Sequence, residues 1–154
     1  LCREKTTDKT LYVGLEEYGE NLANGNMKHI IYYIKQRKDA IGELIAEYVE
    51  GGTVEELGSP PLYFDLQELN YEDYRWFIEK LKGLKRYGYI VFDMSNSALT
   101  DYHILSLFDK VYVPMIPEDA SYKKVEIFYR ILSKVNLSQI RERIEEIYVF
   151  EKRE

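Results

Sequence analysis

The sequence predicts an α/β domain with a mostly parallel sheet flanked by helices on both faces. Short apolar segments rich in strand formers alternate with longer segments whose apolar residues recur at a helical period. Helical crossovers join parallel strands, so this alternation favours parallel pairing. The strand-like segments are continuously apolar, which is typical of a sheet covered on both faces. The length suits a single domain, residues 1–154.

The elements can be placed along the chain from these periods and from their end signals. Asn70, with Asp73 three residues later, has the pattern of a helix cap. No Asn-Gly pair or similar turn signal separates two predicted strands, so no hairpin is expected. Strands are expected near residues 10–15, 62–65, 87–93, 110–116 and 146–150. Helices are expected over residues 28–50 (with a second helix beginning at Asp39), 70–84, 100–108, 121–135 and 137–145.

Composition excludes several classes of function. The net charge of −6 argues against general binding to nucleic acids or anionic membranes, because both need a surplus of Lys and Arg. No apolar run approaches the ~20 residues of a transmembrane helix. The single cysteine, Cys2, cannot form an internal disulfide, so a cytoplasmic location is expected. The chain starts with Leu1, which we take not to be the natural start of the protein.

Two acidic positions stand where parallel strands are predicted to end, which is where such sheets bind ligands. Asp93 directly follows the apolar run Ile90–Phe92. An acid there can hold a Mg²⁺ shell or accept a phosphoryl group, but it can equally cap a loop by bonding backbone amides. Glu16 follows the first strand, together with Glu17. Solvated acids after a strand are common, so both interpretations stay open for each position.

Four segments of the chain resemble segments of the ParA/MinD family of P-loop ATPases, and they occur in the same order along the chain. Residues 87–93 (Tyr-Gly-Tyr-Ile-Val-Phe-Asp) resemble the family's Walker B segment. Residues 108–118 resemble the following block, an Asp, a strand, a Pro and a Pro-Glu pair. Residues 9–17 resemble the strand that follows the first helix and ends in an acidic motif. Residues 62–84 resemble a branch linked to pilus-assembly and chromosome-partitioning ATPases.

The resemblance implies a three-layer nucleotide-binding fold whose cofactors are ATP and Mg²⁺. It implies that Asp93 is a metal ligand and that Asp93 and Glu16 lie in the cofactor site of the intact protein. It further implies a nucleotide-dependent positioning, partitioning or regulatory module that acts with a protein partner or as a homodimer. No specific contact with nucleic acid is expected.

The family's phosphate-binding loop is not found in this sequence. Residues 5–7 (Lys-Thr-Thr) resemble its end, but no glycines precede them and no room is left for a helix before the first strand. We therefore expect a chain that is either degenerate or without the first strand, the loop and the first helix. Gly14 aligns with the first acid of the acidic motif, and the family's adenine-reading Asn is not evident near Phe150. Alone, the chain is expected to carry no cofactor and not to hydrolyse ATP.

Two alternatives remain beside the nucleotide-binding domain. One is a non-enzymatic interaction module that kept the fold and lost the chemistry. The other is a receiver-like domain in which Asp93 accepts a phosphoryl group. The receiver ranks last, because its acidic pair and acceptor are much closer in sequence than Glu16 and Asp93, and because no Lys precedes Pro114 or Pro117.

Overall fold

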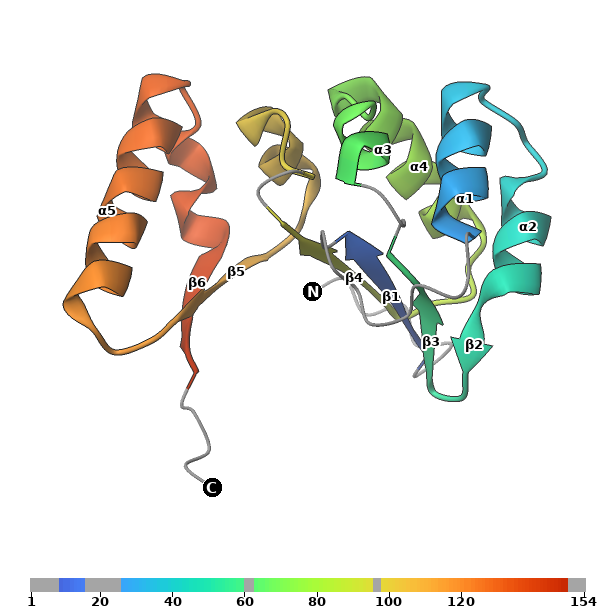
Figure 1. Ribbon diagram of the computed structural model, residues 1–154, viewed down its shortest axis with the longest axis horizontal. Helices are drawn as coiled ribbons and strands as arrows, with labels where there is room; N and C mark the ends of the chain where they lie inside the picture. Colours follow the sequence, from blue (N-terminus) through green and yellow to red (C-terminus); the bar gives the residue numbers. More distant parts are fainter. Residues whose placement is uncertain (1–8, 16–25, 60–62, 96–97, 150–154) are drawn as a thin grey trace. The chain divides into compact units, whose positions relative to one another are not determined.

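The computed structural model in Figure 1 describes residues 9–15, 26–59, 63–95 and 98–149. The chain divides into two compact units, Leu1–Asp101 and Tyr102–Glu154. Each unit has its own sheet and its own helices. The units are described separately below.

The first unit is built on a four-stranded sheet with the order β2-β3-β1-β4. Its central strand, β1, pairs in parallel with β3 on one side and with β4 on the other. The short strand β2 pairs antiparallel with β3. The strands are β1 (Thr10–Leu15), β2 (Glu50–Gly51), β3 (Val54–Leu57) and β4 (Tyr89–Met94).

Helices α1 (Asn26–Lys35), α2 (Ile41–Tyr48), α3 (Tyr63–Gln67) and α4 (Tyr71–Gly83) lie together on one side of this sheet (Figure 1). Phe77 of α4 meets Phe92 of β4 edge-on, with ring centroids 6.0 Å apart. The core between helices and sheet is apolar and fully buried, and includes Leu11, Val13, Ile30, Ile34, Leu57 and Leu81. Burial of this apolar layer is the main stabilising contribution.

The second unit pairs β5 (Val111–Met115) in parallel with β6 (Ile144–Tyr148). Helix α5 (Asp119–Lys134) connects them, together with a 3₁₀ helix, η2 (Ser138–Arg143). Another 3₁₀ helix, η1 (Tyr102–Leu107), precedes β5. The buried side chains include Met115, Val125, Leu132, Leu137 and Ile140. This is a βαβ unit with a helical crossover, and the Tyr129 hydroxyl of α5 donates to Glu146 of β6 at 2.9 Å.

The mostly parallel sheets flanked by helices confirm the predicted fold class. The strands predicted over residues 10–15, 87–93, 110–116 and 146–150 are present to within a few residues as β1, β4, β5 and β6. The helix predicted over residues 28–50 is indeed two helices, α1 and α2. The Asn70 side chain caps α4 by accepting the Asp73 amide at 3.1 Å.

The strand predicted near residues 62–65 is wrong, because residues 63–67 form the helix α3; residues 60–62 lie outside the described part. The strand that pairs with β1 on the side away from β4 is instead β3. It is a Val-Glu-Glu-Leu segment in which exposed and buried residues alternate. Because two adjacent glutamates interrupt this segment, it is not a continuous apolar run, and the sequence pattern does not predict it as a strand. Here Glu55 is buried with its charge compensated, while Glu56 stays exposed.

The expectation that no hairpin occurs is also wrong. Strands β2 and β3 form a small antiparallel hairpin across Gly52 and Thr53. Gly51 has φ +119°, and a Cβ there would lie 2.1 Å from the carbonyl oxygen of Val54. Only glycine is free to take this conformation without strain. Gly51 therefore ends β2 in a conformation that lets the chain turn through Gly52 and Thr53 into β3.

Candidate functional site

Asp93 lies at the carboxyl edge of the four-stranded sheet. In the parallel register of β1 and β4, Gly14 is opposite Asp93 and Leu15 is opposite Met94. Ser95 links the ends of β1 and β4 by two hydrogen bonds. Its backbone amide and its hydroxyl both donate to the Leu15 carbonyl, at 3.3 and 3.0 Å. Because parallel strands end at one edge, Asp93 lies where open α/β sheets bind ligands.

Glu16, the second predicted site residue, lies outside the described residues. The strand that leads to it, β1, ends at Leu15 on the same edge of the sheet as Asp93. The predicted proximity of Glu16 and Asp93 therefore remains a prediction.

Tyr12 is the residue of this site that the sequence analysis missed. Its hydroxyl donates a hydrogen bond to Oδ2 of Asp93. The two residues come from neighbouring strands and lie diagonally across the same face of the sheet, because Tyr12 is opposite Val91 in the register. An ionised carboxylate has about four acceptor positions, so Asp93 can take further partners. Only the register of β1 against β4 brings the pair together, and the sequence does not display that register.

Gly14 leaves the face beside Asp93 without a side chain. A Cβ at position 14 would lie 2.9 Å from Oγ of Ser59, closer than real Cβ atoms approach a neighbour. The acid that the family resemblance expects at this position would therefore require Ser59 to move. The absence of a Cβ at Gly14 is what allows Ser59 to approach the strand this closely.

A second buried carboxylate, Glu55, lies on β3 and has three hydrogen-bond partners. Lys9 Nζ and an Arg86 nitrogen both lie 2.6 Å from Oε1, and the Tyr87 hydroxyl donates to Oε2 at 2.8 Å. Burial alone raises the pKa of Glu55, but the bonds from Lys9, Arg86 and Tyr87 outweigh it and lower the pKa to about 2. Its partners satisfy this carboxylate, and it ties β3 to the segments that precede β1 and β4. Its role is therefore structural.

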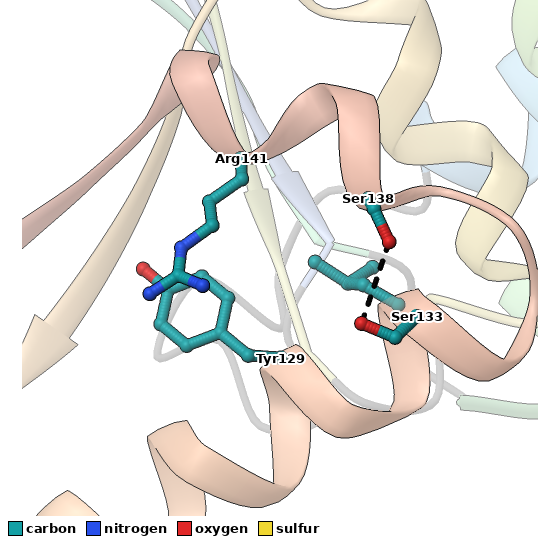
Figure 2. A pocket seen from close by; sticks show the side chains of 5 residues that line it. Tyr129, Ser133, Ser138 and Arg141 are labelled. Carbon is teal, nitrogen blue, oxygen red and sulfur yellow. Dashed lines mark hydrogen bonds between the residues drawn. The ribbon is translucent and has the colours of Figure 1, made fainter.

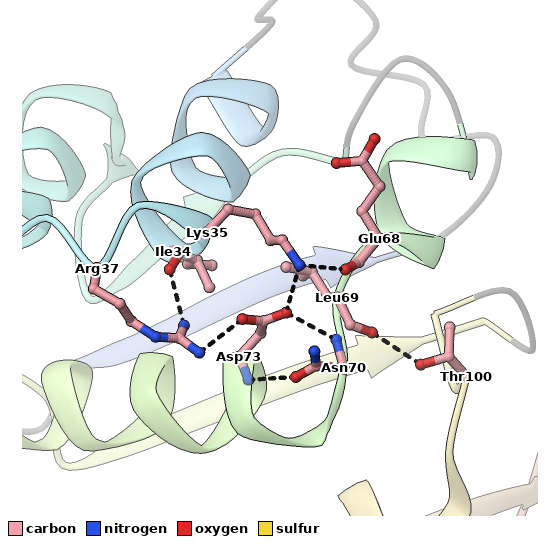
Figure 3. Close-up of polar contacts among 8 residues, drawn as sticks. All are labelled: Ile34, Lys35, Arg37, Glu68, Leu69, Asn70, Asp73 and Thr100. Atoms are coloured by element: carbon pink, nitrogen blue, oxygen red, sulfur yellow. Dashed lines mark hydrogen bonds and ion pairs between the residues drawn. The ribbon is translucent and has the colours of Figure 1, made fainter.

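A third cluster, drawn in Figure 3, joins α1 to the start of α4. Asp73 accepts from the Asn70 amide at 3.0 Å and from Lys35 Nζ at 3.1 Å, and an Arg37 nitrogen lies 2.8 Å from its other oxygen. Burial raises the pKa of this carboxyl, but the Asn70 amide and the two cations hold the pKa below its ordinary value. Lys35 also donates to the Glu68 carbonyl at 3.0 Å. These contacts join α1 to the start of α4, so the role of Asp73 is structural.

The second unit has a small hollow of about 110 Å³ between α5 and η2. Figure 2 shows the Arg141 guanidinium over the Tyr129 ring, 4.6 Å from its centroid, and the Ser133 and Ser138 hydroxyls 3.4 Å apart. Drug-sized ligands occupy pockets of roughly 300–1,000 Å³. The hollow is therefore too small for a nucleotide, and Asp93 does not line it.

The described residues contain no group of three or more His, Cys, Asp or Glu side chains that could hold a metal ion. Among the same residues, no helix has the length and apolar character needed to cross a membrane.

The arrangement of strands and helices matches known structures. A ParA family ATPase from Chlorobium tepidum TLS superimposes with a TM-score of 0.69 at 14% identity, over 95% of this chain and 62% of that one. The fold is that of the ParA/MinD ATPases. A chain of the MinC:MinD cell division complex from Aquifex aeolicus gives 0.57 at 15% identity, over 91% of this chain and 55% of that one.

A third ParA/MinD-like structure is a plasmid partition protein from Borrelia burgdorferi B31 bound to AMPPNP. It gives a TM-score of 0.54 at 19% identity, over 95% of this chain and 65% of that one. The chain thus spans less than two thirds of the length of all three structures. No family model matches the sequence, and no curated protein matches it either. The likeness is one of fold.

Proposed function

We propose that this chain is the body of a ParA/MinD-type nucleotide-binding domain, which in the intact protein binds ATP with Mg²⁺. The observation that carries the proposal is the position of Asp93, at the carboxyl edge of a parallel sheet of this fold. The domain serves as a nucleotide-dependent positioning, partitioning or regulatory module. It acts with a protein partner or as a homodimer, in a reducing compartment such as the cytoplasm.

Asp93 is the proposed metal ligand, with residues 87–93 as the Walker B segment. Glu16, which follows β1, is proposed to lie beside it in the cofactor site. Bound Mg²⁺ would supply positive charge to the phosphate oxygens of the nucleotide. The Tyr12 hydroxyl donates a hydrogen bond to the Asp93 carboxylate.

The first strand, the phosphate loop and the first helix are proposed to come from residues that precede Leu1 in the full-length protein. The similar solved structures are longer than this chain, which supports such a segment. Hydrolysis depends mainly on backbone amides and a lysine that stabilise the transferring phosphoryl group. We therefore propose that the chain alone does not hydrolyse ATP. Its sequence between residues 62 and 84 favours the pilus-assembly and chromosome-partitioning branch.

A second candidate is an interaction module without nucleotide. Two observations favour it: the Tyr12 hydroxyl already occupies one oxygen of Asp93, and Gly14 replaces an acid of the family motif. In this case the MinC:MinD complex among the similar structures is the relevant analogy, a protein–protein assembly on the same fold.

Thermal unfolding of the full-length protein with and without ATP separates the two candidates. A ligand that binds only the folded state raises the midpoint of unfolding. The nucleotide-binding proposal predicts a rise with ATP and Mg²⁺ that disappears when EDTA replaces Mg²⁺. No rise at millimolar ATP and Mg²⁺ contradicts the proposal and leaves the interaction module.

A further inference from the structure

The hydroxyl of Ser59 is a further polar group at the carboxyl edge of the four-stranded sheet, beside Asp93. Ser59 follows the end of β3, and its Oγ lies 2.9 Å from the position that a Cβ of Gly14 would take. Gly14 is opposite Asp93 in the register of β1 and β4. Ser59 and Asp93 therefore lie on either side of one position of the central strand, and that position carries no side chain.

The spacing of the strands brings the two groups within reach of one hydrated metal ion. Paired residues of neighbouring strands point to the same face, about 4.8 Å apart, so the Asp93 Cβ and the Ser59 hydroxyl are separated by at most about 8 Å. The Asp93 carboxylate extends beyond its Cβ. A carboxylate oxygen, a Mg²⁺ ion and one of its waters span about 4 Å, and a hydrogen bond from that water adds about 2.8 Å. The separation thus suits a contact through a metal-bound water.

The fold leaves the Ser59 hydroxyl unused. Within the described part of the chain it has no hydrogen-bond partner, although the residue is half-buried. Other hydroxyls near this edge are paired: Ser95 donates to the Leu15 carbonyl at 3.0 Å, and Thr100 donates to the Leu69 carbonyl at 2.9 Å. A hydroxyl has one donor and two acceptor positions. Those of Ser59 are therefore available to water or to a bound ligand.

We propose that Ser59 is a positioning residue of the Asp93 site, whose hydroxyl holds a water of the Mg²⁺ shell. When it binds through one or two carboxylates, Mg²⁺ keeps several of its waters, and such a water needs an acceptor. The Ser59 oxygen supplies one across the bare position of Gly14. The inference rests on the proposed function, since it requires Mg²⁺ and ATP at Asp93.

Two substitutions separate this role from simple packing of Ser59 against β1. Ser59→Ala removes the oxygen and keeps the Cβ, whereas Ser59→Thr keeps the hydroxyl. A packing role depends on the volume at position 59, but the proposed role depends on the oxygen. Ser138→Ala is the matched control, because Ser138 lies in the second unit with its hydroxyl 3.4 Å from that of Ser133.

Isothermal titration of the full-length protein with ATP, at several fixed Mg²⁺ concentrations, tests the inference. We expect Ser59→Ala to bind ATP with Mg²⁺ about fivefold more weakly, which corresponds to the loss of one hydrogen bond. It should also need more Mg²⁺ for half-maximal ATP binding, a change that a packing role would not cause. Ser59→Thr and Ser138→Ala should bind like the wild type. Thermal unfolding of each variant checks that it is folded.

Gly14→Ala gives a second, independent variant. Its Cβ would meet Oγ of Ser59 and displace the hydroxyl, so it should weaken the binding of ATP with Mg²⁺. In the Ser59→Ala background no Oγ is present, and the same change should have a much smaller effect on affinity. A double-mutant cycle of the four affinities measures this coupling.

Equal affinity and equal Mg²⁺ dependence in the wild type and Ser59→Ala overturn the inference and leave the proposed function intact. An equal loss in Ser59→Ala and Ser59→Thr also overturns it, because the hydroxyl is then not the group that matters. No binding of ATP to the wild type is a different result, which removes the proposed function and this inference together.

Discussion

The hydroxyl of Tyr12 on β1 donates a hydrogen bond to the carboxylate of Asp93 on β4, across two parallel strands and on the face of the sheet opposite Phe92 and Phe77. The Asp93 carboxylate lies at the carboxyl edge of the sheet, where open α/β sheets bind ligands. The hydrogen bond uses one of the oxygens that a metal shell could use. Tyr12 thus links the two candidate functions of the chain.

Replacing Tyr12 with Phe is expected to strengthen the binding of Mg²⁺ and ATP to the full-length protein. The change removes only the hydroxyl, so the metal shell no longer competes with a hydrogen bond worth about 1 kcal/mol, or about fivefold in affinity. Calorimetric titration measures the change, with Tyr32→Phe as the control on α1. Weaker binding in Tyr12→Phe would mean that the hydroxyl positions Asp93 for the metal instead of competing with it.

Because of Glu55, the free energy of unfolding is expected to fall at acidic pH. Its pKa is about 2 in the folded state, against an ordinary value of 4.5. The stabilisation from its ionised form is therefore complete above about pH 4.5 and is lost as the pH falls towards 2. Its size is on the order of 3 kcal/mol, since one pKa unit corresponds to about 1.4 kcal/mol.

The variant Glu55→Gln should show this loss already at pH 7. It leaves Lys9 and Arg86 without their shared carboxylate but keeps the size of the side chain. Urea unfolding between pH 7 and pH 3 measures the difference between variant and wild type, which should shrink as the pH falls. Glu56→Gln, at the exposed neighbour, is the control. A difference that stays constant over this range would contradict the assigned role of Glu55.

Elements that have a local sequence pattern could be predicted from the sequence. Contacts that depend on how the strands pair could be seen only in the structure. The apolar runs of β1, β4 and β5 and the Asn70 cap are visible in single segments, so they were found. The strand β3 was missed because Glu55 is buried only through contacts with Lys9 and Arg86, which are far away in sequence. Asp93 was found because it ends an apolar run, whereas Tyr12 needed the pairing of two strands.

Gly14 and Ser59 should show coupled effects on stability. Gly14→Ala brings a Cβ against Oγ of Ser59, so we expect it to lower the midpoint of thermal unfolding. In a Ser59→Gly background that contact is absent, and the alanine should be neutral or stabilising by about 0.4–1 kcal/mol, as for Gly→Ala at compatible sites. A double-mutant cycle by thermal unfolding measures the coupling. Equal effects in both backgrounds would show that Ser59 is not what limits position 14.

Asp73→Asn is expected to lower the free energy of unfolding, because it weakens the contacts between α1 and α4. The amide keeps the shape of the side chain but loses the charge that faces Lys35 and Arg37. These two cations are partly exposed, so the cost should be about 1–2 kcal/mol, in the range of a lost helix cap. Chemical unfolding measures it, and Asp39→Asn, with an exposed carboxylate paired to Lys80, is the control. An effect no larger than that of the control would contradict the role of Asp73.

The central claim is that Asp93 holds Mg²⁺ beside ATP in the full-length protein. Isothermal titration of that protein with ATP and Mg²⁺ tests it most directly, in the wild type, in Asp93→Ala and in Asp39→Ala, whose carboxylate is 90% exposed. The account predicts saturable binding to the wild type and to Asp39→Ala, and a loss of at least about tenfold in affinity in Asp93→Ala. Equal affinity in all three proteins, or no binding to the wild type, would contradict it.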